Sequence, residues 1–291
     1  MLIALGFIIV FASIFGGYVF SGGSMGPLLQ PFEFLMIGGA AIGAFVAANN
    51  FKTIKSTLLA LPKLKRTNKY DKAMYLDVLA LLFALLSKAR RDGMLGIERD
   101  IENPEDSDLF KTYPKVLEDP MVMQFVVDYL RLMISGNTDP HELNELMLHE
   151  IEGFEHHASL PVDALNKVSD ALPAFGIVAA VMGVVKALTM ADAGPDIMGQ
   201  MIAHALVGTF LGILFAYGLV APFASRIDRQ VGEANKMLQC LRVTLLASLN
   251  GSAPSLAVEF GRKALHGNDR PSNAELEDYV RGNRSAEAAD A

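Results

Sequence analysis

Two apolar segments near the middle of the chain constrain its fold more than any other feature. Ala171–Met190 and Met201–Pro222 are joined by the short polar turn Ala191–Gln200, and each is long enough to cross a bilayer as a helix. The first carries Pro173 near its start, and the second ends at Pro222. Proline in a membrane helix frees a carbonyl that packing or water must satisfy, so this end of the hairpin is a candidate functional region.

Two further apolar spans, Leu2–Phe20 and Phe34–Ala48, lie at the start of the sequence. Mean hydropathy is +0.32, yet 20 % of the residues are charged, which indicates a membrane protein with a substantial soluble part. Leu2–Phe20 lacks the basic start of a signal peptide and is followed at once by another span, so we interpret it as a membrane helix. The predicted fold is an all-α polytopic membrane protein with four transmembrane helices and a helical cytoplasmic domain.

Basic residues predict the orientation. Of the 25 Lys and Arg residues, 15 lie within residues 51–170 and nine within residues 225–291, whereas the turns 21–33 and 191–200 have none. By the positive-inside rule the two turns lie outside, and the large loop and the tail lie in the cytoplasm. Four spans then place both termini in the cytoplasm.

The expected organisation has four parts. They are transmembrane helices 1 and 2 (1–50), a cytoplasmic helical loop domain (51–169), transmembrane helices 3 and 4 (170–223), and a cytoplasmic helical extension with a flexible tail (224–291). Residues 73–91 are apolar and periodic, but the apolar core of that stretch is too short to cross a bilayer, so we predict a buried soluble helix there. Other helices are predicted at 121–134, at 141–157, from Pro222 through Asn250, and at 255–265.

Small residues form stripes along three of the spans. The stripes comprise Pro173, Gly176, Ala180, Gly183 and Ala187 on the third span, Gly208, Gly212 and Ala216 on the fourth, and Gly39 and Gly43 on the second. Such faces either pack tightly on a neighbouring helix or line a path that another helix occupies. For Gly39 and Gly43, packing within the chain and contact in an oligomer both remain open.

The chemistry that the sequence lacks is also informative. Neither central span has an aspartate or glutamate in its middle, although intramembrane carboxylates are the usual sign of an ion path. A titrating carboxylate is therefore expected on a different polypeptide. No catalytic triad, paired-cysteine or HExxH metal motif, or phosphate-binding loop is present, so we predict no enzyme, cofactor or metal site. The net charge of −7 argues against nucleic-acid binding, and Cys240, the single cysteine, is interpreted as a packed residue.

Four stretches resemble the MotA family of flagellar motor stator subunits, part of the MotA/TolQ/ExbB superfamily. They are DALPAFGIVAAVMGVVKAL from Asp170, IAHALVGTFLGILFAYGLVAP from Ile202, KARRDGMLGIERDIENP from Lys88 and VEFGRKAL from Val258. Together with the four spans they extend the resemblance over nearly the whole chain. The resemblance implies a location in the bacterial inner membrane, within the lipid bilayer.

The resemblance also implies partners and site residues. A homo-oligomeric ring, described as five chains, surrounds a dimer of MotB, whose single transmembrane helix carries the titrating aspartate. Pro173 and Pro222 match prolines that couple protonation of that aspartate to a conformational change, and Thr209 matches a threonine on the ion path. Arg90 and Glu98 match charged loop residues that engage the rotor protein FliG.

The residues leave some alternatives to this interpretation. Arg90 is also placed to cap the end of its helix, and Glu98 to form an ordinary surface ion pair. Pro173 fits the first turn of a helix, and Pro222 fits the point where a span leaves the lipid. A TolQ- or ExbB-like subunit that energises an outer-membrane process is an alternative function, although those relatives have three spans. A non-conducting membrane scaffold is another.

The identity of the ion rests on two positions. Sodium-driven relatives carry hydroxyls on both central spans, where this chain has Ala180 and Thr209. A dehydrated sodium ion needs several oxygen ligands, whereas a proton needs none. The methyl group of Ala180 therefore favours protons.

Overall fold

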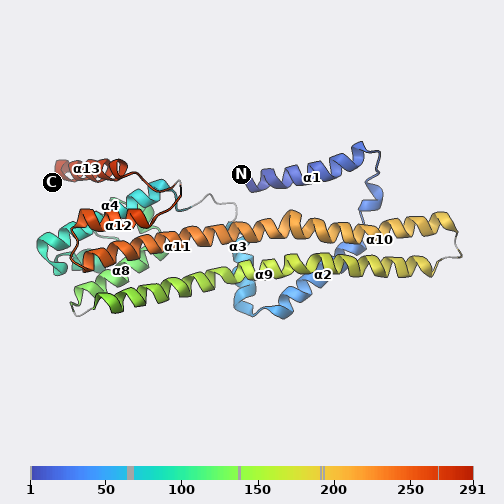
Figure 1. The fold of residues 1–291 in the computed structure, drawn as a ribbon, viewed down its shortest axis with the longest axis horizontal. Coiled ribbons are helices and arrows are strands. Elements are labelled where there is room, and N and C mark those ends of the chain that lie inside the picture. Colours follow the sequence, from blue (N-terminus) through green and yellow to red (C-terminus); the bar gives the residue numbers. More distant parts are fainter. Residues whose placement is uncertain are drawn as a thin grey trace. The chain divides into compact units, whose positions relative to one another are not determined.

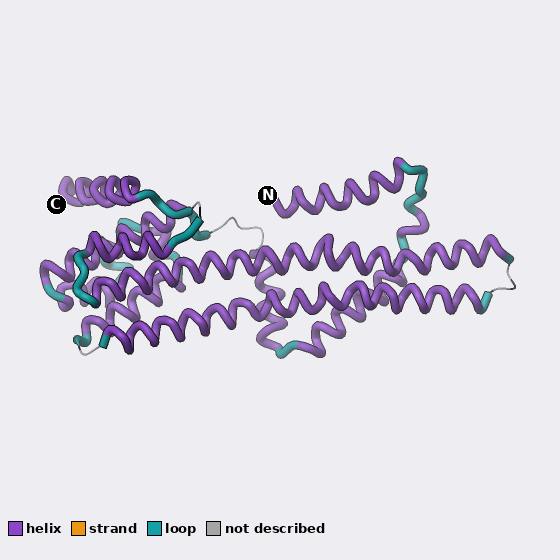
Figure 2. The backbone as a smooth tube through the Cα atoms, viewed as in Figure 1, coloured by secondary structure: helices purple, strands orange, loops and turns teal. Residues whose placement is uncertain are grey.

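The structure is a computed structural model that describes residues 2–63, 69–136, 139–190, 192, 194–267 and 269–290. Every regular element among these residues is a helix, as Figure 2 shows. The chain divides into two compact units. One, the membrane unit, comprises Met1–Thr67 and Ala158–Arg229, and the other, the loop unit, comprises Asn68–His157 and Gln230–Ala291.

The membrane unit contains the apolar helices. Its elements are α1 (Leu2–Phe20), η1 (Gly26–Leu28), α2 (Pro31–Ala48), α3 (Phe51–Lys63), the later part of α9 (Pro140–Leu188), α10 (Pro195–Phe215), the π-helical turn η4 (Ala216–Val220) and the start of α11 (Ala221–Leu249). Four helical stretches of the described chain are long and apolar enough to cross a membrane: Ile3–Phe20, Gly26–Ala48, Pro140–Leu188 and Pro195–Leu249. The prediction of four transmembrane helices in an all-α protein is confirmed.

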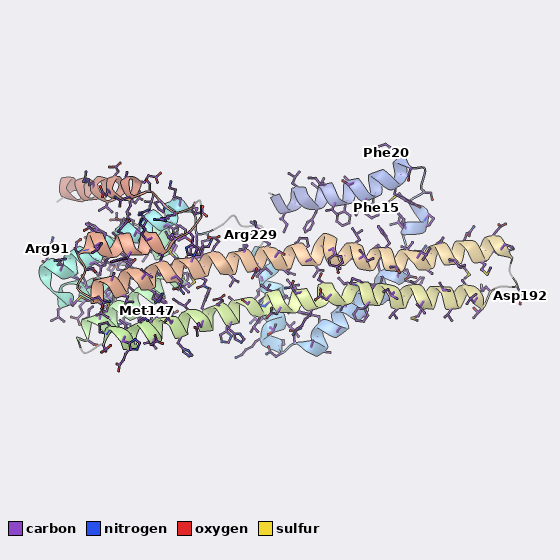
Figure 3. The ribbon with its side chains drawn as sticks, viewed as in Figure 1. Phe15, Phe20, Arg91, Met147, Asp192 and Arg229 are labelled. Carbon is purple, nitrogen blue, oxygen red and sulfur yellow. The ribbon has the colours of Figure 1, made fainter. Side chains whose placement is uncertain are left out.

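The core of the membrane unit forms where α2 meets α9 and α10. Ile37 and Ala41 of α2, Leu172 and Ala179 of α9, and Val207 and Leu211 of α10 are buried together. Helix α1 packs through aromatic rings, with ring centroids 5.0 Å apart for Phe7 and Phe223 and 6.0 Å apart for Phe15 and Phe210. Figure 3 shows Phe15 on the side of α1 that faces α10.

The loop unit is a helical domain built around α4 (Lys72–Asp92). Its other elements are η2 (Met94–Ile97), α5 (Glu98–Glu102), α6 (Asp108–Lys111), α7 (Pro114–Leu117), α8 (Pro120–Ile134), the first part of α9, most of α11, α12 (Pro254–Ala264) and α13 (Asn273–Asp290). Nearly every apolar side chain of α4 between Met74 and Leu86 is buried. The prediction of a buried helix at residues 73–91 is therefore confirmed.

Side-chain caps and a glycine define the ends of the helices in the loop unit. Asp71 accepts a hydrogen bond from the Met74 amide at 2.9 Å and begins α4, which ends at Gly93 with φ +81°. Asp119, only 1 % exposed, accepts the Met121 amide at the start of α8. Cys240 is completely buried, and burial raises the pKa of its thiol to about 12, as expected of a packed residue.

The observed helices differ from the predicted ones in three respects. The helix predicted at residues 141–157 and the third span belong to one helix, α9, which contains Pro161 and Pro173. Pro173 therefore lies inside a helix, and the alternative that it occupies a first turn is wrong. Helix α3 and the turn η4 were not predicted: α3 follows the second span and carries lysines among its apolar residues, and η4 continues the apolar segment that ends at Pro222. Helix α13 occupies the polar tail, and its contacts with α4 rather than its composition explain it. Flexibility of the last residues remains a prediction.

Candidate functional site

Pro222 lies directly after a change in helical geometry. It is the second residue of α11, which follows η4, a π-helical turn from Ala216 to Val220. The Ala221 amide donates to the Ala216 carbonyl oxygen, five residues earlier, instead of the usual four. Proline has no amide hydrogen to donate, and π-helical turns are rare features that occur often at functional sites. The structure therefore shows an irregular backbone where the sequence indicates a hinge.

Pro173 is connected to the same turn through Ser169. Ser169 lies four residues before Pro173 on α9, so the proline removes the usual helical donor to the Ser169 carbonyl. The Ser169 hydroxyl donates to the Ala216 carbonyl oxygen at 3.0 Å, and both residues are buried. One buried hydrogen bond thus joins the regions around Pro173 and Pro222, the two prolines that the sequence indicates as candidate hinges.

The small-residue stripes of α9 and α10 pack against each other. A Cβ added to Gly176 would lie 2.8 Å from the Gly208 carbonyl oxygen, and one added to Gly212 would lie 2.7 Å from the Leu172 carbonyl oxygen. Such distances leave no room for a side chain, because real Cβ atoms essentially never approach backbone atoms this closely. Figure 1 shows the two helices running side by side. Of the two uses predicted for these faces, the structure shows helix packing.

Ala180 and Thr209 lie on either side of this contact. A Cβ on Gly208, the residue before Thr209, would lie 3.3 Å from the Ala180 amide nitrogen. Ala180 is 9 % exposed, and Thr209 is partly buried. The two residues on which the ion assignment rests therefore lie along the same contact between α9 and α10, Ala180 beside Gly208 and Thr209 beside Gly176.

Gly39 and Gly43 behave differently from the glycines of α9 and α10. Both are exposed on α2, and a Cβ added to either would have no neighbouring atom within 4 Å among the described residues. Packing within the chain does not explain this pair. The small-residue face of α2 remains open in the described chain.

Sequence reasoning missed one charged residue at this site, Glu33. It was assigned to the outer turn, but it lies in the first turn of α2 and is 8 % exposed. Its Oε2 atom is buried without a hydrogen-bond partner among the described residues, 2.9 Å from where a Cβ of Gly208 would lie. Glu33 precedes the buried Ile37 and Ala41 at four-residue spacing, a signal that would have placed it on the inner face. The absence of carboxylates holds for the two central spans, but α2 supplies one.

Arg90 and Glu98 lie in a second region, in the loop unit. Arg90 is in the last turn of α4 and Glu98 begins α5, with η2 between them, and both side chains are exposed. Neither forms an ion pair with another described residue, so the surface-pair interpretation of Glu98 is not supported. Figure 3 marks the neighbouring Arg91 at this end of α4.

A polar network fixes α4 against α5 beside these two residues. The Lys88 ammonium forms an ion pair with Asp100 Oδ2 at 2.7 Å, and the Ser107 hydroxyl donates to Asp100 Oδ1 at 2.7 Å. Asp100 is 9 % exposed and Ser107 is 7 % exposed. Both carboxylate oxygens of Asp100 are therefore satisfied, and the Lys88–Asp100 pair joins α4, which carries Arg90, to α5, which begins at Glu98.

The described residues offer no obvious place for a metal ion. No group of three or more His, Cys, Asp or Glu side chains among them is arranged to hold one. The candidate features of the membrane unit are a buried carboxylate and two proline-containing helices. The loop unit separately carries an exposed pair of opposite charges.

Comparison with known proteins identifies two matching family models. The model for the motility protein A N-terminal domain matches residues 4–93, and that for the MotA/TolQ/ExbB proton channel family matches residues 117–239. Motility protein A of Salmonella typhimurium is 54 % identical, with 98 % of this chain and 97 % of the relative covered. Motility protein A of Escherichia coli is also 54 % identical, with 97 % and 95 % covered.

Two solved structures share the fold. The flagellar MotAB stator complex from Bacillus subtilis matches with a TM-score of 0.73 at 26 % identity, covering 88 % of this chain and 92 % of the other. The C. jejuni MotAB structure matches with a TM-score of 0.77 at 22 % identity, covering 93 % and 98 %, and supports the fold alone. Both agree with the predicted architecture of four membrane helices.

Proposed function

The chain belongs to the motility protein A family, and on that premise we propose that it is a stator subunit of the bacterial flagellar motor. With a MotB-type partner it forms an ion channel whose flux generates torque on the rotor. The observation that carries this proposal is the 54 % identity over nearly the full length of both chains. The chain is a multi-pass membrane protein, and its family consists of channel subunits rather than enzymes.

The proposed partner is a single-span protein of the MotB type that contributes the titrating aspartate. Solved relatives are complexes named MotAB, which supports such a partner and an oligomeric assembly. We further propose a ring of five chains around a partner dimer. The open small-residue face at Gly39 and Gly43 supports contact between neighbouring helices, because exposed glycines allow close approach of a second backbone.

The proposed location is the bacterial inner membrane, with both termini, the large loop and the C-terminal extension in the cytoplasm. The distribution of Lys and Arg supports this orientation. The proposed division at residues 1–50, 51–169, 170–223 and 224–291 follows from it. In this orientation the turn between α9 and α10, where Figure 3 marks Asp192, lies outside.

The proposed mechanism couples protonation to helix movement. Protonation of the partner's aspartate removes a buried charge, and α9 and the α10–η4–α11 segment then shift about Pro173 and Pro222. The π-helical turn before Pro222 and the Ser169–Ala216 hydrogen bond support a coupled hinge, because both lie at these prolines. The electrical part of the driving force is about 2.3 kcal/mol per charge per 100 mV.

The movement is proposed to reach the rotor protein FliG through Arg90 and Glu98. Exposure of both side chains and the absence of an ion-pair partner among the described residues support this role. The proposed ion is the proton, because Ala180 supplies a methyl group to the contact where sodium-driven relatives carry a hydroxyl.

Complementation tests the function. A motile bacterium that lacks its stator genes should regain swimming when it expresses this chain with its MotB-type partner. Failure to restore swimming, with both proteins present in the membrane, would contradict the stator proposal. Restoration of outer-membrane energisation instead would favour the TolQ/ExbB alternative, and restoration of neither process would favour the scaffold.

The ion and the rotor contact have separate tests. Motility should persist without sodium and stop when the proton gradient collapses, and the reverse pattern would overturn the proton assignment. Charge reversal at Arg90 or Glu98 should impair swimming without lowering the membrane level of the chain. Reversal at the exposed Lys115 of the same unit is the matched control and should leave swimming intact.

A further inference from the structure

Glu33 is a buried acidic residue that the proposed mechanism does not use. Its side chain is 8 % exposed, and its Oε2 atom has no hydrogen-bond partner among the described residues. A buried carboxylate without a partner is costly, and ionisable groups inside membrane spans are rare and usually functional. The residue therefore calls for an explanation beyond packing.

Glu33 lies far from the outer end of the hairpin that α9 and α10 form. Its Oε2 atom lies beside Gly208, which is about 20 Å along α10 from Pro195 at 1.5 Å per residue. A Cβ of Gly208 would meet Glu33 Oε2 at 2.9 Å and the Ala180 amide nitrogen at 3.3 Å. Glu33 thus lies at the level of Ala180 and Thr209, the two residues that decide the ion assignment.

A structural interpretation explains only part of this arrangement. Glu33 lies in the first turn of α2, where a carboxylate is favoured by the helix dipole. An exposed carboxylate would provide that stabilisation without losing its hydration. Glu33 instead heads the buried stripe of Ile37 and Ala41, and a glycine at position 208 leaves room for its carboxyl group.

We propose that Glu33 is a proton-binding group of the ion path. In the proposed orientation it accepts a proton from a hydronium ion of the outer aqueous phase, so that an O–H bond of the hydronium ion breaks, an Oε2–H bond forms and water is left. It then releases the same proton to the carboxylate on the partner and returns to its charged form. No electrons are exchanged. This role rests on the proposed function, because it requires the partner's carboxylate as the next acceptor.

Other titratable side chains lie on the helices packed around Glu33. His204 is one turn before Gly208 on α10, and Lys186 is near the end of α9. His204→Gln and Lys186→Met are therefore included when the response to pH is measured, so that their titration is not assigned to Glu33.

The test in cells uses Glu33→Gln, which keeps the shape of the side chain and cannot carry the proton. In the complemented strain it should reduce motor speed at low load at least two-fold, and the deficit should grow as the external pH rises. Glu33→Asp should restore most of the speed. Asp196→Asn, which neutralises an exposed carboxylate of α10, is the matched control and should give the same motor speed as the unaltered chain. Wild-type speed of Glu33→Gln at every load and pH would overturn the proposal.

A second measurement does not depend on rotation. Infrared difference spectra of the purified complex with its partner, recorded between high and low pH, should show a carboxyl carbonyl band that is absent from Glu33→Gln and shifted in Glu33→Asp. A spectrum unchanged in both variants would overturn the proposal. If the unaltered chain fails to restore swimming, the stator proposal is overturned. If it restores swimming but the carboxyl band is the same in the unaltered chain and the Glu33 variants, only this inference is overturned.

Discussion

The Ser169 hydroxyl donates a hydrogen bond of 3.0 Å to the carbonyl oxygen of Ala216, and both residues are buried in the membrane unit. The donor lies four residues before Pro173, and the acceptor begins the π-helical turn before Pro222. Because Ala216 also accepts the Ala221 amide, its carbonyl oxygen serves two donors at once. The bond connects the two proposed hinges and offers a direct way to test whether they move together.

Replacement of Ser169 with alanine should weaken this connection without unfolding the helices. The Ala216 carbonyl keeps its backbone donor, so the loss should be about 1 kcal/mol or less. We expect a small fall in the thermal midpoint of the purified complex and a larger relative change in motor speed. Thr189→Ala, which removes an exposed hydroxyl bound to the Lys186 carbonyl of its own helix, is the control. Equal effects of the two variants would argue against coupled hinges.

Gly212→Ala should disrupt the contact between α9 and α10. Its new Cβ would lie 2.7 Å from the Leu172 carbonyl oxygen and 3.0 Å from the Gly176 Cα, and backbone must move to relieve this overlap. Such overpacking costs about 1–3 kcal/mol, which outweighs the helix propensity gained. The thermal midpoint of the complex should fall. Gly199→Ala, on the same helix with no atom within 4 Å of its added Cβ, should leave it unchanged or raised; a fall in both variants would refute the packing argument.

Asp100→Ala should destabilise the surface that presents Arg90 and Glu98. It leaves the Lys88 ammonium and the Ser107 hydroxyl without their partner, at a cost of about 1–3 kcal/mol. We expect faster hydrogen exchange in α5 and slower swimming at an unchanged membrane level. Asp106→Ala removes an exposed carboxylate nearby and should change neither measurement. Normal exchange in α5 of Asp100→Ala would show that the network does not position this surface.

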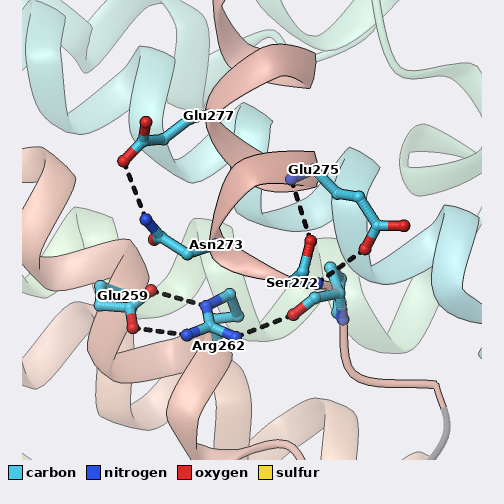
Figure 4. A network of polar contacts seen from close by, with 7 residues as sticks. Glu259, Arg262, Ser272, Asn273, Glu275 and Glu277 are labelled. Carbon is cyan, nitrogen blue, oxygen red and sulfur yellow. Dashed lines mark hydrogen bonds and ion pairs between the residues drawn. The ribbon is translucent and has the colours of Figure 1, made fainter.

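Docking of α13 should depend on pH through Glu275. Figure 4 shows Glu275 beside Ser272, and its carboxylate accepts from the Lys72 ammonium at 2.6 Å and the Ser272 amide at 2.7 Å. The Lys72 hydrogen bond, followed by those of Ser272, lowers the pKa of Glu275 from about 4.5 to about 2. A lowered pKa stabilises the folded form above about pH 4.5, and this contribution is lost as the pH falls toward about 2.

Hydrogen exchange of the α13 amides measures this dependence. Protection should decrease between pH 4.5 and pH 2 in the unaltered chain, and Glu275→Gln should show less of this change. Arg262, also drawn in Figure 4, donates to the Glu259 carboxylate and to the Pro271 carbonyl oxygen before α13, and these bonds are kept intact in both proteins. Identical pH profiles for the two proteins would exclude Glu275 as the responsible group.

Several features of the site could be predicted because they depend on the chain alone. Proline lacks an amide hydrogen wherever it occurs, so Pro173 and Pro222 each remove a helical donor, and the charge of Arg90 and Glu98 favours exposure. The four-residue spacing from Glu33 to Ile37 and Ala41 indicates the inner face of α2, but no pattern in the sequence shows that Gly208 of α10 lies opposite its carboxyl group. The functional roles of all these residues remain predictions.

The sequence by itself determined the four apolar spans, the buried helix at residues 73–91 and the helical class, since hydrophobicity and periodicity are local properties. Tertiary structure alone decided which stripes pack together, that Ser169 reaches Ala216, and that the Glu33 carboxyl lies beside Gly208. Those relations join helices that are far apart along the chain. They depend on side chains and backbone fitting together to within a few tenths of an ångström, which no local pattern encodes.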